Sequence, residues 1–242
     1  TTRWEATTFR RGLDSCSRAR VLFRSPDESR ILLRTQTKSI YRHSYTAVHY
    51  IYSVENKTFE VLSDGGPQQV PLFSPDGNLI AFVRDNNLFL VKLLFGNSES
   101  QITKDGKFNE VLNGIPDWVN EEEFSTNRSF DFSADSKMLA WVRYDESKVP
   151  VYSMTMYQGA APALTQNTDY PGAYAYKYPV AGAQNADVKV LTFDIQSRRI
   201  NEMQLPLEKD GYIPRIKFTS DPEKLAIVTL NRHQSVMNIY MA

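Results

Sequence analysis

One pattern occurs four times in this sequence: an aromatic residue, small residues and an aspartate precede a short apolar run. The clearest copy is Phe73-Ser74-Pro75-Asp76-Gly77 before Leu79–Val83. The Ser-Pro-Asp-Gly segment is typical of turns, because Pro fixes φ, Asp bonds to the backbone ahead and Gly accepts a positive φ. Each copy therefore predicts a hairpin between two strands. The four predicted hairpins lie near residues 23–34, 73–84, 132–143 and 218–229.

The segments between these hairpins are also typical of strands. Their apolar runs are short, rich in β-branched and aromatic residues, and bounded by turn residues, which argues against helices. Examples are Tyr50–Val54, Leu88–Val91 and Val190–Asp194. Several short strands in each repeat predict an all-β fold, a partial β-propeller of about four antiparallel, four-stranded blades.

The spacing of the four turn aspartates locates two insertions. Asp27, Asp76, Asp135 and Asp221 are separated by 49, 59 and 86 residues, whereas one blade needs roughly 40–50. The extra residues lie near 113–124 and 149–182. Insertions in repeat proteins form loops on one face and often carry function. We therefore look for function in these two segments.

Composition excludes several classes of protein. The 242 residues include 28 Lys+Arg and 28 Asp+Glu, so the net charge of zero argues against a broad nucleic-acid surface. The apolar runs are too short for a transmembrane helix, which needs about 18 residues. The single cysteine, Cys16, cannot form an internal disulfide.

The first insertion carries a run of three acidic residues. Asp117 is suited to cap a short helix, and Glu121, Glu122 and Glu123 follow in that helix. One interpretation is a solvated, charged helical face. The other is a pair of carboxylates that binds a cation, since two carboxylates can accept the three N–H groups of an ammonium.

Other polar residues give weaker signals. Arg42 precedes a predicted strand, and it is either an ordinary surface arginine or a binding residue. The sequence has no Gly-x-Ser-x-Gly segment, so it supplies no hydrolase nucleophile of that type. The histidines, His43, His49 and His233, lack the partners that a catalytic triad or a metal site needs. We predict no catalytic residue, no metal site and no cofactor in this chain.

Four motifs resemble those of the dipeptidyl peptidase IV family and occur in the family's order. They are residues 42–47, 117–123, 145–150 and 178–182, and the resemblance runs from about Phe23 to Tyr240. This family consists of serine exopeptidases that remove dipeptides from free N-termini, with Pro or Ala preferred in the second position. The resemblance implies that the chain is part of an N-terminal, eight-bladed propeller, which a C-terminal α/β-hydrolase domain follows in the family.

The resemblance also implies roles for individual residues. Glu122 and Glu123 would hold the α-ammonium of the substrate, and Arg42 would bind the carbonyl of its first residue. Asn120 stands where the family commonly has Tyr. We expect the 242-residue chain, without the hydrolase domain, to gate and recognise peptides but to be inactive alone. We also expect an exported parent protein, in the periplasm or at the cell surface, whose signal is not in this chain.

The second insertion, residues 150–181, predicts a two-stranded arm. Tyr152, Met154 and Met156 alternate onto one face, and Tyr174, Tyr176 and Tyr178 do the same in the second half. The arm could fold back on its own blade. It could also contact a partner, because Tyr and Met are enriched in interface cores. The resemblance favours a projecting arm that helps to form a homodimer of the parent.

Two other functions remain open from the sequence. A non-catalytic propeller that binds proteins is one, although paired glutamates and Arg42 argue against it. The propeller of a prolyl oligopeptidase-type endopeptidase is the other, although an endopeptidase gains nothing from an anchor for a free amine.

Overall fold

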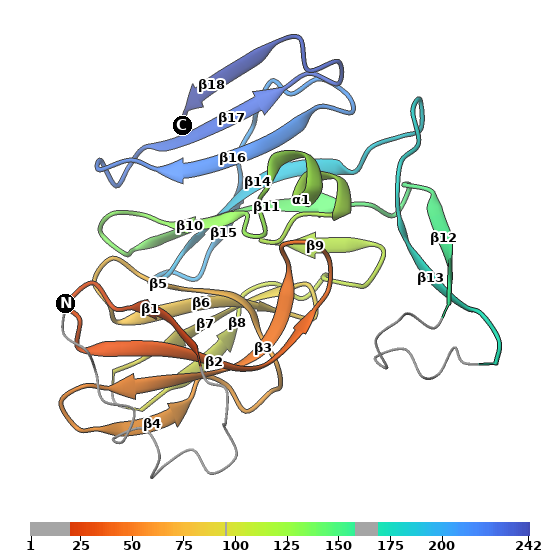
Figure 1. Ribbon diagram of the computed structural model, residues 1–242. Helices are drawn as coiled ribbons and strands as arrows, with labels where there is room; N and C mark the ends of the chain where they lie inside the picture. The colour runs from red at the N-terminus through yellow and green to blue at the C-terminus, as the bar shows by residue number, and fades with distance from the viewer. Residues whose placement is uncertain (1–19, 95, 158–168) are drawn as a thin grey trace, which may run out of the picture. The chain divides into compact units, whose positions relative to one another are not determined.

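The computed structural model describes residues 20–94, 96–157 and 169–242. These residues form two compact units, which are 20–84 with 88–102, and 85–87 with 103–242. Strands dominate both units, and the single helix of the described residues belongs to the second (Figure 1). That helix is α1 (Trp118–Phe124), which has seven residues. Among the described residues, no helix is long and apolar enough to span a membrane.

The first unit contains two four-stranded antiparallel sheets, in which neighbours along the chain are neighbours in the sheet. The first sheet consists of β1 (Arg20–Arg24), β2 (Arg30–Ser39), β3 (Tyr45–Ser53) and β4 (Thr58–Val61). The second consists of β5 (Gln69–Phe73), β6 (Leu79–Arg84), β7 (Asn87–Lys92) and β8 (Ser98–Gln101). Buried side chains from both sheets, among them Leu32, Phe73 and Phe82, form one core. This up-and-down order is that of a propeller blade.

The second unit contains a five-stranded and a three-stranded sheet. The order of the larger sheet is β10-β11-β14-β15, and β9 pairs with β11 beyond the end of β10. Its strands are β9 (Val111–Asn113), β10 (Phe130–Phe132), β11 (Met138–Asp145), β14 (Asp187–Asp194) and β15 (Ile200–Glu202). The smaller sheet consists of β16 (Tyr212–Phe218), β17 (Leu225–Leu230) and β18 (Met237–Met241), one strand fewer than we predicted for a blade. The fold class is confirmed as an all-β partial β-propeller.

The repeated turns join the strands that the sequence predicts. In the second copy, Ser74 Oγ donates to Asp76 Oδ1 over 2.5 Å and accepts from the backbone N–H of Leu79 over 3.0 Å. Asp76 Oδ1 also accepts from the backbone N–H of Asn78 over 3.1 Å. The Ser–Asp bond recurs at 2.6 Å and 2.7 Å in the copies at Asp27 and Asp135. The repeat is therefore a hydrogen-bonded turn that closes a hairpin.

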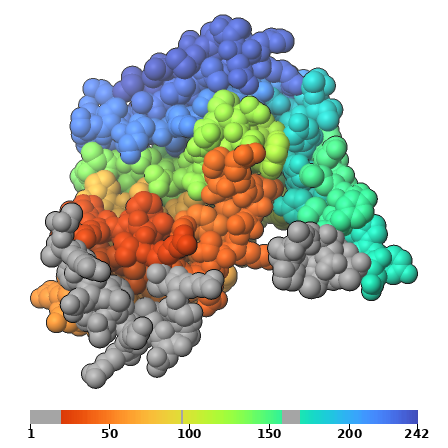
Figure 2. Space-filling model, viewed as in Figure 1, coloured from red at the N-terminus to blue at the C-terminus, as the bar shows by residue number. Residues whose placement is uncertain are grey.

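A two-stranded arm is inserted between β11 and β14. It consists of β12 (Val151–Met156) and β13 (Gly172–Lys177), and residues 158–168, for which we predicted a loop, lie outside the described residues. Tyr152 pairs with Tyr176, and Met154 pairs with Tyr174, so these side chains share one face as predicted. The side chains of β12 are mostly exposed, and Figure 2 shows the arm standing out from the strands of its unit. The arm therefore projects.

Candidate functional site

The acidic helix α1 begins at a buried aspartate. Asp117 is 5 % exposed, and its Oδ1 accepts from the backbone N–H of Asn120 over 2.9 Å and from Asn120 Nδ2 over 2.7 Å. This is an N-cap, as the sequence predicts, and it satisfies a backbone N–H that a helix leaves without a partner. Burial raises the pKa of Asp117 above its usual range.

The three glutamates of α1 lie in different surroundings. Glu121 is 2 % exposed, whereas Glu122 is half-buried and Glu123 is exposed. Successive residues of a helix are about 100° apart around its axis, which explains the difference. The prediction of a uniformly solvated face is therefore wrong for Glu121. Glu122 and Glu123, the two residues predicted to bind an ammonium, are the two with accessible surface.

The C-terminal end of α1 is held by β16. The side chain of Arg215 donates to the backbone carbonyl of Phe124, and the ring of Phe124 lies 5.7 Å from that of Tyr212, edge to face. Ser125 follows in the left-handed conformation, and its N–H donates to the carbonyl of Glu121. A cation at a helix C-terminus is favourable, because the last carbonyls carry partial negative charge.

The N-terminal end of α1 contacts residues 176–178, which we call the root of the arm. The ring of Trp118 lies 5.5 Å from that of Tyr176 and 5.0 Å from that of Tyr178. No local pattern in the sequence links Trp118 with the arm, since the residues are about 60 positions apart. The aromatic character of both segments was the one available signal.

A second buried acid, Glu146, lies close enough to Asp117 to be affected by its charge. Glu146 is 5 % exposed, and burial together with the charge of Asp117 raises its pKa to about 8, although Lys177 opposes the shift. Lys177 Nζ donates to the carbonyls of Val149 and Ser147, over 2.7 Å and 3.2 Å. Glu146 is part of the motif at 145–150, but nothing in that motif identified it as buried.

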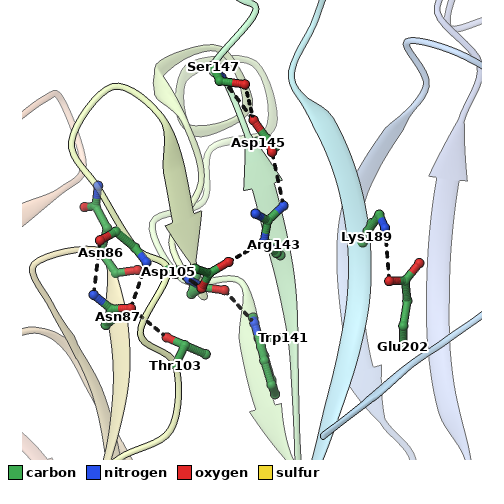
Figure 3. Close-up of polar contacts among 12 residues, drawn as sticks. Asn86, Asn87, Thr103, Asp105, Trp141, Arg143, Asp145, Ser147, Lys189 and Glu202 are labelled. Atoms are coloured by element: carbon green, nitrogen blue, oxygen red, sulfur yellow. Dashed lines mark hydrogen bonds and ion pairs between the residues drawn. The ribbon is translucent and has the colours of Figure 1, made fainter.

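A polar network holds the segment that leads into α1 (Figure 3). Arg143 Nε donates to Asp105 Oδ2 over 2.8 Å, and Asn113 Nδ2 donates to Asp105 Oδ1 over 2.9 Å. Trp141 Nε1 donates to Asn113 Oδ1 over 3.1 Å. These bonds tie the end of β9 to β11, so the loop that carries Asp117 starts from a fixed point.

Arg42 lies in the first unit, in the tight loop between β2 and β3. The N–H of Ile40 donates to the carbonyl of Ser44 over 3.0 Å, and the N–H of Tyr41 donates to Ser44 Oγ over 3.2 Å. Arg42 is exposed in this loop. Because Arg42 and the two glutamates belong to different units, a common site for the three remains a prediction.

In the described part of the chain, no three His, Cys, Asp or Glu side chains converge as metal ligands.

Comparison with known proteins gives consistent matches. Residues 25–242 match the family model of the dipeptidyl peptidase IV N-terminal region. The chain is 35 % identical over 228 residues to "Probable dipeptidyl-aminopeptidase B" of Colletotrichum graminicola, covering 90 % of this chain and 24 % of that protein. It is 33 % identical over 227 residues to dipeptidyl-aminopeptidase B of Aspergillus niger, covering 90 % and 25 %.

A solved structure also matches. The crystal structure of Porphyromonas gingivalis dipeptidyl peptidase 4 superposes with a TM-score of 0.86 at 43 % identity, covering 95 % of this chain and 32 % of that one. The chain thus spans about a quarter of the length of the curated relatives and about a third of this structure.

Proposed function

Because the chain belongs to the family of dipeptidyl peptidase IV N-terminal regions, we propose that it is the substrate-recognition part of a serine exopeptidase that removes N-terminal dipeptides. The observation that carries the proposal is the acidic helix α1, in which the side chains of Glu122 and Glu123 are half-buried and exposed, respectively. The same residues belong to the acidic motif, residues 117–123, that resembles one of the family. Peptides with Pro or Ala in the second position are the proposed substrates.

The chemistry of a free N-terminus explains why carboxylates suit this role. An α-amino group has a pKa of about 8 and is largely cationic at neutral pH, whereas an internal peptide nitrogen carries no charge. An ammonium can donate charge-assisted hydrogen bonds to two carboxylates, but an internal peptide segment cannot. Such a site therefore selects chain ends. It also fixes the distance from the amine to the scissile bond.

Arg42 is proposed to bind the carbonyl of the first substrate residue. Its guanidinium is always charged and carries five N–H donors, which suits a carbonyl oxygen. Its contact is with a neutral group, so its loss is expected to cost less than the loss of a glutamate.

The test uses the full-length peptidase that contains this region and a Gly-Pro p-nitroanilide substrate. Glu122→Gln and Glu123→Gln keep the size of the side chain but remove its charge. Charge-assisted bonds contribute roughly 1.5–3 kcal/mol, so we expect kcat/KM to fall about 10- to 100-fold. Glu202→Gln is the control. Glu202 lies on the exposed strand β15 and pairs with Lys189 of β14. Wild-type kcat/KM in both test variants would refute the assignment.

The arm supports a second part of the proposal, a homodimer of the parent protein. Tyr152, Met154 and Tyr174 are 40–48 % exposed on one face of the arm. A lone hairpin is marginally stable in water, so a covered face is favourable. Removing residues 150–181 should shift the full-length protein toward monomer in sedimentation analysis. An unchanged dimer would contradict this part.

Export of the parent protein to the periplasm or cell surface also remains a prediction.

A further inference from the structure

Helix α1 depends on its neighbours for its position. It has seven residues, whereas isolated helices shorter than about 12 residues are marginal in water. Contacts with other segments therefore decide where its side chains point. Arg215 and Tyr212 hold its C-terminal end, and the rings of Tyr176 and Tyr178 pack on Trp118 at its N-terminal end.

The root of the arm is itself firmly attached to the unit. Lys177 Nζ donates to the carbonyls of Val149 and Ser147, and the N–H of Tyr178 donates to the carbonyl of Pro150 over 3.0 Å. Successive residues of a strand point to opposite faces. Lys177 thus secures one face of the root, while Tyr176 and Tyr178 present the other face to α1.

Burial distinguishes this root from the rest of the arm. Tyr176 is 8 % exposed and is the one buried residue of β12 and β13. Its ring also lies 6.4 Å from those of Tyr152 and Tyr178. The aromatic cluster of the arm therefore continues directly onto Trp118.

Trp118 and Glu122 share a face of α1. Residues four positions apart in a helix lie one above the other, so the surface that fixes Trp118 also fixes the direction in which Glu122 leaves the helix. A small rotation of a two-turn helix changes where its carboxylates lie, and binding geometry is sensitive to shifts of about 1 Å.

We propose that Tyr176 and Tyr178 are positioning residues for the ammonium-binding carboxylates, and that they act through Trp118. The inference rests on the proposed function, because it assigns the arm root a role in that same site. In this arrangement the arm is more than a contact for another subunit. Its root orients α1, so substrate affinity depends on residues that touch neither the substrate nor the reacting atoms.

The test compares variants of the full-length peptidase. Tyr178→Leu should raise KM for Gly-Pro p-nitroanilide about five- to tenfold with little change in kcat. This rise corresponds to about 1–1.4 kcal/mol, which lies within the contribution of one aromatic pair. Tyr178→Phe keeps the ring and should restore the wild-type KM. Hydrolysis of p-nitrophenyl acetate, which has no amine, should not change in any of these variants.

Tyr174→Leu is the matched control. Tyr174 lies on β13, on the same face as Tyr176, and its ring is 5.6 Å from that of Tyr176. It lies outside the root of the arm. If the effect came from weakened association of arms, Tyr174→Leu would show it at least as strongly. An equal rise in KM in Tyr174→Leu, or a parallel loss of acetate hydrolysis in Tyr178→Leu, would overturn the positioning role.

A double-mutant cycle separates this inference from the proposed function. If Tyr178 acts through the carboxylates, adding Tyr178→Leu to Glu122→Gln should cost less than twofold, because the interaction it supports is already lost. The full single-mutant loss in that background would contradict the inference. Unchanged kinetics in both Glu122→Gln and Glu123→Gln would contradict the proposed function itself. A loss in Glu122→Gln combined with wild-type kinetics in Tyr178→Leu would overturn the positioning role alone.

Discussion

At the scale of single residues, His49 is a histidine enclosed in the first unit. It is 0 % exposed, and its Nδ1 lies 2.9 Å from Gln68 Oε1, which also accepts from the backbone N–H of His49 over 3.1 Å. Burial is the main cause that lowers the pKa of His49 to about 4. The imidazole is therefore uncharged at neutral pH, with Nδ1–H donating to Gln68.

The lowered pKa of His49 predicts loss of stability in acid. The unfolded chain takes up the proton near pH 6.5, whereas the folded chain resists until about pH 4, so stability falls as the pH drops through this range. Relative to His49→Asn, which keeps an N–H donor, wild type should lose about 2–3 kcal/mol between pH 7 and pH 4.5. Urea unfolding of both proteins measures this difference. Parallel pH profiles would contradict it.

Glu146 predicts the opposite dependence in the second unit. Its folded-state pKa of about 8 lies above the ordinary value of 4.5 for a glutamate, so its contribution to stability is present in acid and is lost as the pH rises from 4.5 through 8. Glu146→Gln keeps the shape of the neutral acid. The variant and wild type should melt together at pH 5, and the variant should be more stable at pH 8.5, by on the order of 2–4 kcal/mol. Equal melting temperatures at pH 8.5 would contradict the prediction.

At the scale of elements, local chemistry made the hairpins and the helix cap predictable. A Ser–Asp turn or an N-cap is formed by residues at most five positions apart, so the sequence contains the whole interaction. The faces of the arm were predictable for the same reason, because strand side chains alternate with a period of two. The fold class also followed from these short segments.

Contacts between distant segments were not predictable in this way. The pair Arg143–Asp105 joins residues 38 positions apart, and Arg215 reaches Phe124 across 91 positions. The burial of Glu121 and Glu146 likewise depends on which sheets pack around them. The family resemblance supplied the roles of Glu122, Glu123 and Arg42, whereas composition and spacing alone left two interpretations open.

The N-cap of α1 gives a prediction at this scale. Asp117→Ala removes an acceptor of two hydrogen bonds and should lower the free energy of unfolding by about 1–2 kcal/mol. Asp117→Asn keeps an acceptor oxygen without the buried charge, and it should be at least as stable as wild type at pH 7. Chemical denaturation of the three proteins provides the measurement. A loss in Asp117→Asn as large as in Asp117→Ala would show that the charge, rather than the cap, is needed.

At the scale of the whole molecule, β18 lies at one side of the three-stranded sheet and carries exposed apolar side chains. Met237, Ile239 and Met241 are 56–63 % exposed. An exposed apolar edge strand favours pairing with another chain. We therefore expect the 242-residue chain to self-associate as its concentration rises, and Ile239→Lys to reduce the association. Light scattering compares the two, and Glu223→Gln in the exposed turn between β16 and β17 is a control for the added positive charge. A wild-type chain that stays monomeric would contradict the prediction.

Helix α1 is proposed to recognise the charge of a free N-terminus. The most direct measurement is the ratio of kcat/KM for Gly-Pro p-nitroanilide to that for the glycolyl analogue, in which a hydroxyl replaces the ammonium. The full-length wild type should prefer the amine by at least about tenfold, and Glu122→Gln should lose most of this preference while its rate with the glycolyl substrate stays unchanged. A preference that survives intact in both Glu122→Gln and Glu123→Gln would contradict the claim.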